Sequence, residues 1–289
     1  MKRRSRRDFA SFMMPALIVL IMVLAVPLVY DVLVSFFDKS LKYPGLGNFI
    51  GLKNYINDLH NDEFTGSVVT TWIFTIGVVS IEFLLGLFIA LGLNALGKGK
   101  NLIFTIIIIP MMITPVAVGL TWRLMLHSQL GIINYLLSFF GVPKIAWLGD
   151  SRLALPTVMF VDIWQNIPYM VLVLMAGLVT LPREPFEAAS IDGASRSQSF
   201  FRLTIPMMMP TFSVVILLRA IMSFKTYDLI YVMTRGGPGT VTQVISYTIY
   251  NQAYRYLNTG TAASMSIYLV LMIIPIAFLF LWLSRNRED

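Results

Sequence analysis

The chain of 289 residues contains no cysteine and only two histidines. The lack of cysteine excludes disulfide bonds and thiolate chemistry, although it does not identify the compartment, since membrane proteins often lack cysteine. His60 and His127 each stand apart from any second residue at metal-ligand spacing, and the sequence has neither a GxxxxGK[ST] phosphate loop nor an HExxH motif. These absences argue against an enzyme that binds a nucleotide, a metal or a cofactor in this chain.

Charged residues are also scarce, at 13% of the chain against 57% apolar residues. A soluble domain of this length would need more polar surface, so the composition indicates an integral membrane protein. The net charge of +7 does not indicate a nucleic-acid partner, because most basic residues flank apolar runs. In that position they set orientation in the lipid bilayer or touch anionic headgroups.

Six apolar runs reach the roughly 20 residues that a helix needs to span a bilayer. We therefore expect an all-α, polytopic membrane protein with six transmembrane helices in one domain, 12–284, between a basic segment 1–11 and a tail 285–289. The first run is too long for a signal peptide and lacks a cleavage site after it, so we expect it to be retained. The expected spans are about 12–36, 68–96, 102–126, 156–181, 206–224 and 262–284.

The distribution of basic residues predicts the orientation. If alternate segments lie on opposite sides, 12 of the 22 Lys and Arg residues fall in the N-terminal segment, 97–101, 182–205 and the C-terminal segment. The other three loops are longer in total but hold 8. By the positive-inside rule, both termini and the loop 182–205 are expected in the cytoplasm.

Small residues and prolines within the spans predict close packing and kinks. Gly86, Ala90 and Gly92 would let the second span approach a neighbouring helix closely. The prolines should interrupt helices whose freed backbone groups then need partners in the protein. These prolines are Pro110, Pro115, Pro168, Pro206 and Pro210. A further Gly- and Pro-rich stretch, TRGGPG at 234–239, is predicted to form a tight turn outside the membrane.

Five ionisable residues lie within the expected spans, where each costs about 2.5–3.5 kcal/mol on insertion scales. Asp31, Arg123, Asp162 and Arg219 share the outward third of their spans, whereas Glu82 lies near the middle of the second. They could pair with one another or reach the headgroups, or they could line a hydrated vestibule. Glu82 should face protein or water, in either a structural or a transport role.

The fourth span carries a polar face. In DIWQNIPY, the residues Asp162, Gln165, Asn166 and Tyr169 stand at i, i+3, i+4 and i+7 of a helix. Carboxylate, amide and phenol groups hydrogen-bond hydroxyls, and aromatic rings stack on sugars. This face is therefore a candidate solute-binding surface, and interhelical hydrogen bonding without a solute is the alternative.

The loop from Glu187 to Pro206, EAASIDGASRSQSFFRLTIP, is polar although it joins two apolar spans. Pro185 and nearby acidic residues suit the first turn of a helix, and Gly193 permits a sharp exit. Ser195 or Ser197 could cap a second helix that runs to a break at Pro206. Such a short, small-residue helix suits a close fit into a groove of another protein, and a merely solvated loop is the alternative.

The same loop resembles the cytoplasmic motif of the permease subunits of binding-protein-dependent ABC importers. That motif reads E-A-A, three residues, Gly, nine residues and I-x-L-P. This chain keeps the register, with Leu203 in place of Ile and Ile205 in place of Leu. The matching residues are Glu187, Ala188, Ala189, Gly193 and Pro206. The resemblance covers most of the chain and is closest to the first permease of the sugar-type branch. Further stretches that carry it are NFIGLKNY, PVAVGLTWRLM, WLGDSRLAL and YDLIYVMTRGGPG.

The resemblance implies a subunit that is not itself an enzyme and holds no cofactor. Its implied partners are a second homologous permease, two cytoplasmic ATPase subunits that bind ATP and Mg, and an extracytoplasmic solute-binding protein, all at a bacterial or archaeal cytoplasmic membrane. A sugar or oligosaccharide would cross by alternating access. The resemblance assigns ATPase coupling to Glu187, Ala188, Ala189, Gly193 and Pro206, and substrate binding to Asp162, Gln165, Asn166, Tyr169, Arg219 and Ser223.

The chain departs from the resemblance at two points. The first outer loop has only about 30 residues, so the large extracytoplasmic domain of some relatives is absent. Met222 stands where many sugar-type members place an acid, so Arg219 is expected to lack its usual partner and to be free for Asp162 or for an anionic substrate. A neutral sugar is the default expectation.

Two other classes of function remain open at this point. An ion-coupled secondary transporter could use Glu82 and Asp162, but it predicts inverted repeats with paired broken helices and leaves the loop unexplained. A membrane enzyme or assembly factor has no catalytic constellation in the sequence to support it.

Overall fold

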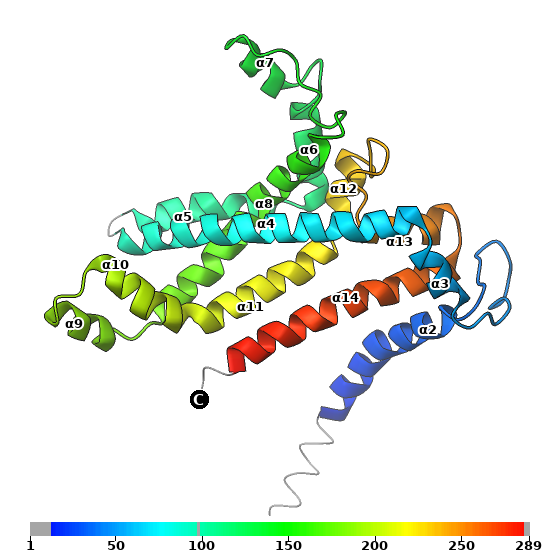
Figure 1. Ribbon diagram of the computed structural model, residues 1–289, viewed down its shortest axis with the longest axis horizontal. Coiled ribbons are helices and arrows are strands. Elements are labelled where there is room, and N and C mark those ends of the chain that lie inside the picture. The colour runs from blue at the N-terminus through cyan, green and yellow to red at the C-terminus, as the bar shows by residue number, and fades with distance from the viewer. Residues whose placement is uncertain (1–12, 97–98, 286–289) are drawn as a thin grey trace, which may run out of the picture. The chain divides into compact units, whose positions relative to one another are not determined.

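The computed structural model describes residues 13–96 and 99–285, and within these ranges the chain is helical with no β-strand (Figure 1). The first long helix, Met13–Val34, includes the π-helical turn η1 (Ile21–Ala25) and α2 (Val26–Val34). The all-α prediction is confirmed, whereas the basic segment 1–11 and residues 286–289 of the tail lie outside the described residues. The other helices are α3 (Lys53–Leu59), α4 (Asp62–Ala95), α5 (Lys100–Ile108), α6 (Pro115–Met125), α7 (Ile132–Ser138), α8 (Ala154–Val179), α9 (Glu184–Ile191), α10 (Arg196–Ser199), α11 (Ile205–Phe224), α12 (Asp228–Met233), α13 (Ile245–Tyr250) and α14 (Thr259–Arg285).

Five described helices are long and apolar enough to cross a membrane, and a sixth candidate span is a bent pair. The pair joins Lys100–Met112 to Pro115–Met125 at an angle of 92°. Thr114, which precedes Pro115, is extended, with φ −63° and ψ 143°, as the proline ring requires of the residue before it. The third expected span is therefore broken. The five single helices are Met13–Val34, Asp62–Ala95, Ala154–Val179, Arg196–Phe224 and Thr259–Phe280.

The other predicted proline breaks do not end a helix. Pro168 lies inside α8 without ending it, and Pro210 lies inside α11. The expected break at Pro206 is wrong, because one helix runs from Arg196 to Phe224. A π-helical turn, η3 (Phe200–Thr204), comes directly before Pro206, so the backbone pairing changes register where the proline lacks an N–H.

The chain forms two compact units. The first contains residues 1–65 and 249–268, and its short helix α3 links the loop after the first span to the start of α14. Asn54 Nδ2 donates hydrogen bonds to the carbonyls of Ser35 and Phe37, at 2.9 and 3.0 Å. The hydroxyl of Ser264, on α14, donates to the buried carboxyl of Asp58 at 2.5 Å. These bonds hold the loop after the first span against the two helices.

The second unit, residues 66–248 and 269–289, contains the main apolar core. Within it, α4, α8 and α11 meet closely, and α12 packs on α6 and α8. A Cβ atom at Gly86 on α4 would stand 2.7 Å from Cβ of Met170 on α8, so Gly86 and the fully buried Ala90 mark a close approach, as predicted. Gly92 has no atom within 4 Å of a Cβ there, so its predicted packing role is wrong.

Asp58 is expected to make stability depend on pH. Burial raises the pKa of its carboxyl from 3.8 to about 6, although the Ser264 hydrogen bond acts the other way. Because the folded state then holds the proton more tightly than the unfolded state, stability should fall as pH rises from about 4 to 6 and level off above. Melting temperatures measured across this window should show the fall in the wild type and not in Asp58→Asn. The exposed Asp38→Asn variant serves as control, and an unchanged slope in Asp58→Asn would contradict the assignment.

The packing at Gly86 gives a second expected outcome. Gly86→Ala should lower the stability of the purified protein by about 1–3 kcal/mol, because the new methyl group overpacks the contact with Met170. Gly92→Ala makes the same chemical change on the same helix in open space, so it should be neutral or slightly stabilising. Thermal denaturation compares the two, and equal melting temperatures would contradict close packing at Gly86.

Candidate functional site

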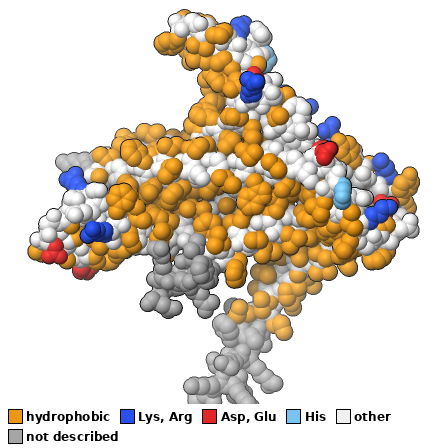
Figure 2. All heavy atoms as spheres, in the orientation of Figure 1, with side chains coloured by type: hydrophobic (Ala, Val, Ile, Leu, Met, Phe, Trp, Pro, Cys, Tyr) orange, Lys and Arg blue, Asp and Glu red, His pale blue; other side chains and the backbone are white. Residues whose placement is uncertain are grey.

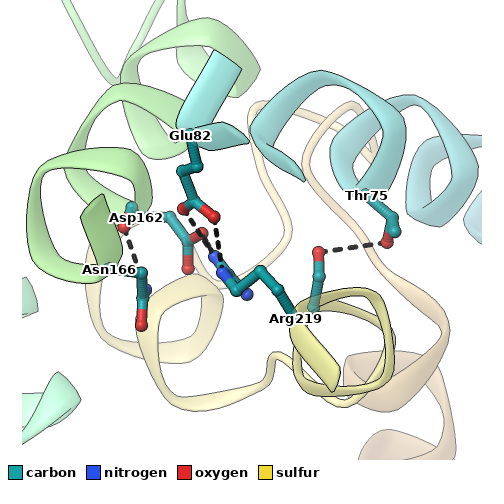
Figure 3. A network of polar contacts seen from close by, with 6 residues as sticks. Thr75, Glu82, Asp162, Asn166 and Arg219 are labelled. Atoms are coloured by element: carbon teal, nitrogen blue, oxygen red, sulfur yellow. Dashed lines mark hydrogen bonds and ion pairs between the residues drawn. The ribbon is translucent and has the colours of Figure 1, made fainter. Parts of the chain in front are cut away.

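A buried group of three ionisable side chains links the helices of the second unit. Arg219 on α11 donates from Nε and Nη2 to the two carboxylate oxygens of Glu82 on α4, at 2.6 and 2.8 Å, and Nη2 also donates to Asp162 on α8. The three side chains point toward one another from three helices (Figure 3). Arg219 is 1% exposed, Glu82 0% and Asp162 5%. We call this group the ion triad.

The ion triad shows which acids pair with Arg219, which was expected to be free for Asp162 or for an anionic substrate. The acid comes from Glu82, 137 residues earlier in the chain, rather than from position 222, where Met222 is 45% exposed. The sequence indicated only that Glu82 faces protein or water. The alternative in which Arg219 pairs with Asp162 is confirmed, and Glu82 is the additional partner.

The polar face of α8 opens on a pocket of about 190 Å³. Three of the predicted solute-binding residues of that helix, Asp162, Gln165 and Asn166, line it together with Arg219. Tyr169, one turn further along α8, is half-buried and is not among the lining residues. The connection from α11 to α12 closes the pocket with residues 225–229, of which Lys225 and Asp228 are charged and exposed.

Two of the predicted residues also serve the packing. Gln165 Nε2 donates a hydrogen bond of 2.9 Å to the carbonyl of Ile113. Ile113 lies in the break between α5 and α6. Ser223 is buried away from the pocket and donates to Thr75 Oγ1 at 3.1 Å. Asn166 Nδ2 donates to the Asp162 carbonyl of its own helix at 2.9 Å. The structure thus groups Asp162, Gln165, Asn166 and Arg219 and leaves Tyr169 and Ser223 outside the pocket.

The remaining charged and turn residues lie elsewhere. Arg123 is exposed, and its Nη1 donates to the carbonyl of Val232 at 2.9 Å, which ties α6 to α12. The tight turn predicted for TRGGPG is confirmed, with positive φ at Arg235 and Gly236 and a hydrogen bond from the Thr242 hydroxyl to the Gly237 carbonyl at 2.9 Å. Neither feature lines the pocket beside the ion triad.

The loop 182–205 contains the predicted short helix α9, and the second predicted helix begins at Arg196 but continues to Phe224. Helix α9 carries Pro185 in its first turn with Glu184 and Glu187, and Gly193 follows it with φ +75°. Ser195 and Gln198 form a capping box at the start of α10: Gln198 N donates to Ser195 Oγ at 3.2 Å, and Ser195 N donates to Gln198 Oε1 at 2.7 Å.

The surface of this loop combines small and polar side chains with two exposed apolar ones, Ile191 at 85% and Phe201 at 63%. Glu187, Ala188 and Gly193 are exposed and Ala189 is half-buried. In Figure 2, hydrophobic side chains cover the long helices, whereas red and blue side chains show at the end that holds α9 and α10 in Figure 1. The loop therefore exposes α9 and the start of α10 at one end of the second unit.

Comparison with known proteins identifies the class. The family model described as "Binding-protein-dependent transport system inner membrane component" matches residues 82–288. The chain belongs to this family, the multi-span permease subunits of ABC importers of the inner membrane. It is a transport permease of a binding-protein-dependent system, and this assignment replaces the alternatives of an ion-coupled transporter or a membrane enzyme.

Two relatives and one solved structure show how far the likeness extends. The chain is 36% identical to the trehalose/maltose transport system permease protein MalF of Thermococcus litoralis, over 83% of this chain and 81% of that protein. It is 30% identical to the sn-glycerol-3-phosphate transport system permease protein UgpA of Agrobacterium fabrum, over 83% and 82%. A bacterial ABC transporter involved in the import of the acidic polysaccharide alginate shares the fold, with a TM-score of 0.85 at 22% identity over 98% of each chain.

The ion triad yields a stability prediction. Arg219→Leu should destabilise the protein by about 3–5 kcal/mol, because it leaves two buried carboxylates without their cation. Arg123→Leu removes the same side chain from an exposed position with one backbone partner, so its cost should be much smaller. Melting temperatures of the two purified variants test this, and a similar loss in both would mean that the triad does not stabilise the fold.

Proposed function

We propose that this chain forms, with a second homologous permease, the path by which an ABC importer moves a sugar or oligosaccharide into the cell. The observation that carries the proposal is a polar pocket beside the ion triad, within a group of helices that are otherwise apolar enough to cross a membrane. Relatives named for trehalose/maltose and for sn-glycerol-3-phosphate support a small hydroxylated solute. In this proposal an extracytoplasmic binding protein delivers the solute.

The size of the pocket supports a shared path. Small-molecule sites usually enclose about 300–1,000 Å³, whereas the pocket on this chain has about 190 Å³. One chain then supplies part of the solute's surroundings, and the second permease supplies the rest. Amide and carboxylate groups of Asp162, Gln165 and Asn166 offer hydrogen bonds to hydroxyls, and Tyr169 offers an aromatic surface one turn along α8.

The loop 182–205 supports a role in coupling. Two cytoplasmic ATPase subunits, which bind ATP and Mg, would receive α9 through Glu187, Ala188, Ala189 and the turn at Gly193. ATP binding would move the loop and switch the cavity from inward-facing to outward-facing, and hydrolysis would reset it. The helix that starts within the loop, at Arg196, continues through Pro206 to Phe224. It can therefore transmit the movement to Arg219. In this proposal both termini lie in the cytoplasm.

The coupling role is tested by co-purification and transport. Glu187→Lys should abolish most solute-dependent ATPase activity and weaken retention of the ATPase subunits, because it reverses a charge on the proposed docking surface. The chain should still insert and fold, since Glu187 is exposed. Pull-down of the tagged permease, with ATPase activity and uptake of labelled maltose in vesicles, measures these effects.

Asp38→Lys is the matched control, because it makes the same charge reversal at an exposed residue of the other compact unit. It should retain the ATPase subunits at the wild-type level. If Glu187→Lys keeps full assembly and ATPase activity, α9 is not the docking helix.

A further inference from the structure

Glu82 lies next to the proposed solute path but does not form part of its surface. Glu82 is fully buried and does not line the 190 Å³ pocket, whereas its partner Arg219 does. Both oxygens of Glu82 accept hydrogen bonds from Arg219, and the two side chains point toward each other (Figure 3). Glu82 can therefore act on a solute only through Arg219.

The charges around the pocket show what Glu82 changes. Among the lining residues, Arg219 and Lys225 are balanced by Asp162 and Asp228. Lys225 and Asp228 are exposed, so water screens their charges, but the ion triad is buried and retains its field. The triad holds two carboxyl groups to one guanidinium, so a single ionised carboxylate already cancels the charge of Arg219. An anionic solute thus finds no uncompensated positive charge at Arg219.

The hydrogen-bond geometry supports the same conclusion. A guanidinium binds a phosphate, sulfonate or carboxylate best through two parallel N–H groups. In Arg219, the Nε and Nη2 pair is already occupied by Glu82, and Nη2 is shared with Asp162. An anion would have to displace a buried carboxylate to obtain this geometry.

We propose that Glu82 is a specificity-determining residue that makes this permease select neutral hydroxylated solutes and exclude anionic ones. It is a positioning residue, because it acts by holding Arg219 and cancelling its charge rather than by touching the solute. This inference rests on the proposed function and adds the charge class of the solute. The relatives leave that class open, since one is named for neutral disaccharides and another for a phosphate ester.

The test uses the complex of this chain with its partner permease and ATPase subunits in lipid nanodiscs. The binding protein is omitted so that its own selectivity is not measured. Dissociation constants are determined for two neutral probes, maltose and trehalose, and two anionic probes, sn-glycerol-3-phosphate and digalacturonate. We expect the wild type to bind a neutral probe at least tenfold more tightly than either anion. Glu82→Gln should shift the ratio of anionic to neutral affinity by about tenfold toward the anion.

Three further variants separate selectivity from structure. Glu82→Asp keeps the charge and should keep the wild-type ratio. Glu82→Gln combined with Arg219→Gln should lose the gain for anions, because the guanidinium N–H groups that Glu82 had occupied are gone. Asp228→Asn removes the same formal charge from an exposed position on the pocket and should shift the ratio by less than about threefold. A purely structural role of Glu82 would weaken both classes of probe equally and leave the ratio unchanged.

Failure of this inference differs from failure of the proposed function. A wild type that binds neither class overturns the proposed solute path, and the inference with it. A wild type that prefers the anions overturns the inference alone, even if Glu82→Gln does not assemble. An assembled Glu82→Gln complex with the wild-type ratio, or an equal shift in Asp228→Asn, also overturns it while the solute path stands.

Discussion

The second unit depends on one buried cation shared between two carboxylates. Arg219 joins α11 to Glu82 on α4 and to Asp162 on α8, and none of the three side chains is more than 5% exposed. Loss of one partner from a buried ion pair costs several kcal/mol, so these helices are held at one separation. Gly86 allows α4 to approach α8, and Gly177 allows α8 to approach α11, where a Cβ would stand 2.7 Å from Thr211. Small residues and the ion triad therefore constrain the same three helices.

The polar face of α8 satisfies structural and transport requirements together. The break between α5 and α6 frees backbone groups that cannot be left unpaired at membrane depth. Gln165 supplies a donor to the Ile113 carbonyl in that break, and its neighbours Asp162 and Asn166 turn to the pocket. Hydrogen bonding between helices and lining of the pocket that we propose for the solute thus coexist on one face.

Local chemistry explains which features the sequence predicted. Apolar runs, the proline and acids at the start of α9, Gly193 and the Ser195 cap act within a few residues, so the spans and the loop helices could be predicted. The Glu82–Arg219 pair joins positions 137 residues apart, and no local pattern encodes it. The same limit applies to Gly92, which has the spacing of a packing residue but faces open space. At Pro206, the π-helical turn that preserves the helix depends on backbone register rather than on residue type.

The unbroken helix from Arg196 to Phe224 limits how the proposed transport cycle can move. Arg219 lies 23 residues beyond Arg196, or about 35 Å at helical rise, so a displacement of the loop reaches the ion triad along one continuous helix, which contains the π-helical turn η3 and Pro210. Arg219 must then either leave its buried carboxylates, at a cost of several kcal/mol, or carry α4 and α8 with it. Moving α4 and α8 together with α11 costs less, because the buried ion pairs of Arg219 then stay intact. In the proposed cycle, the three helices therefore move as one body, and the cavity opens and closes against the second permease rather than within this chain.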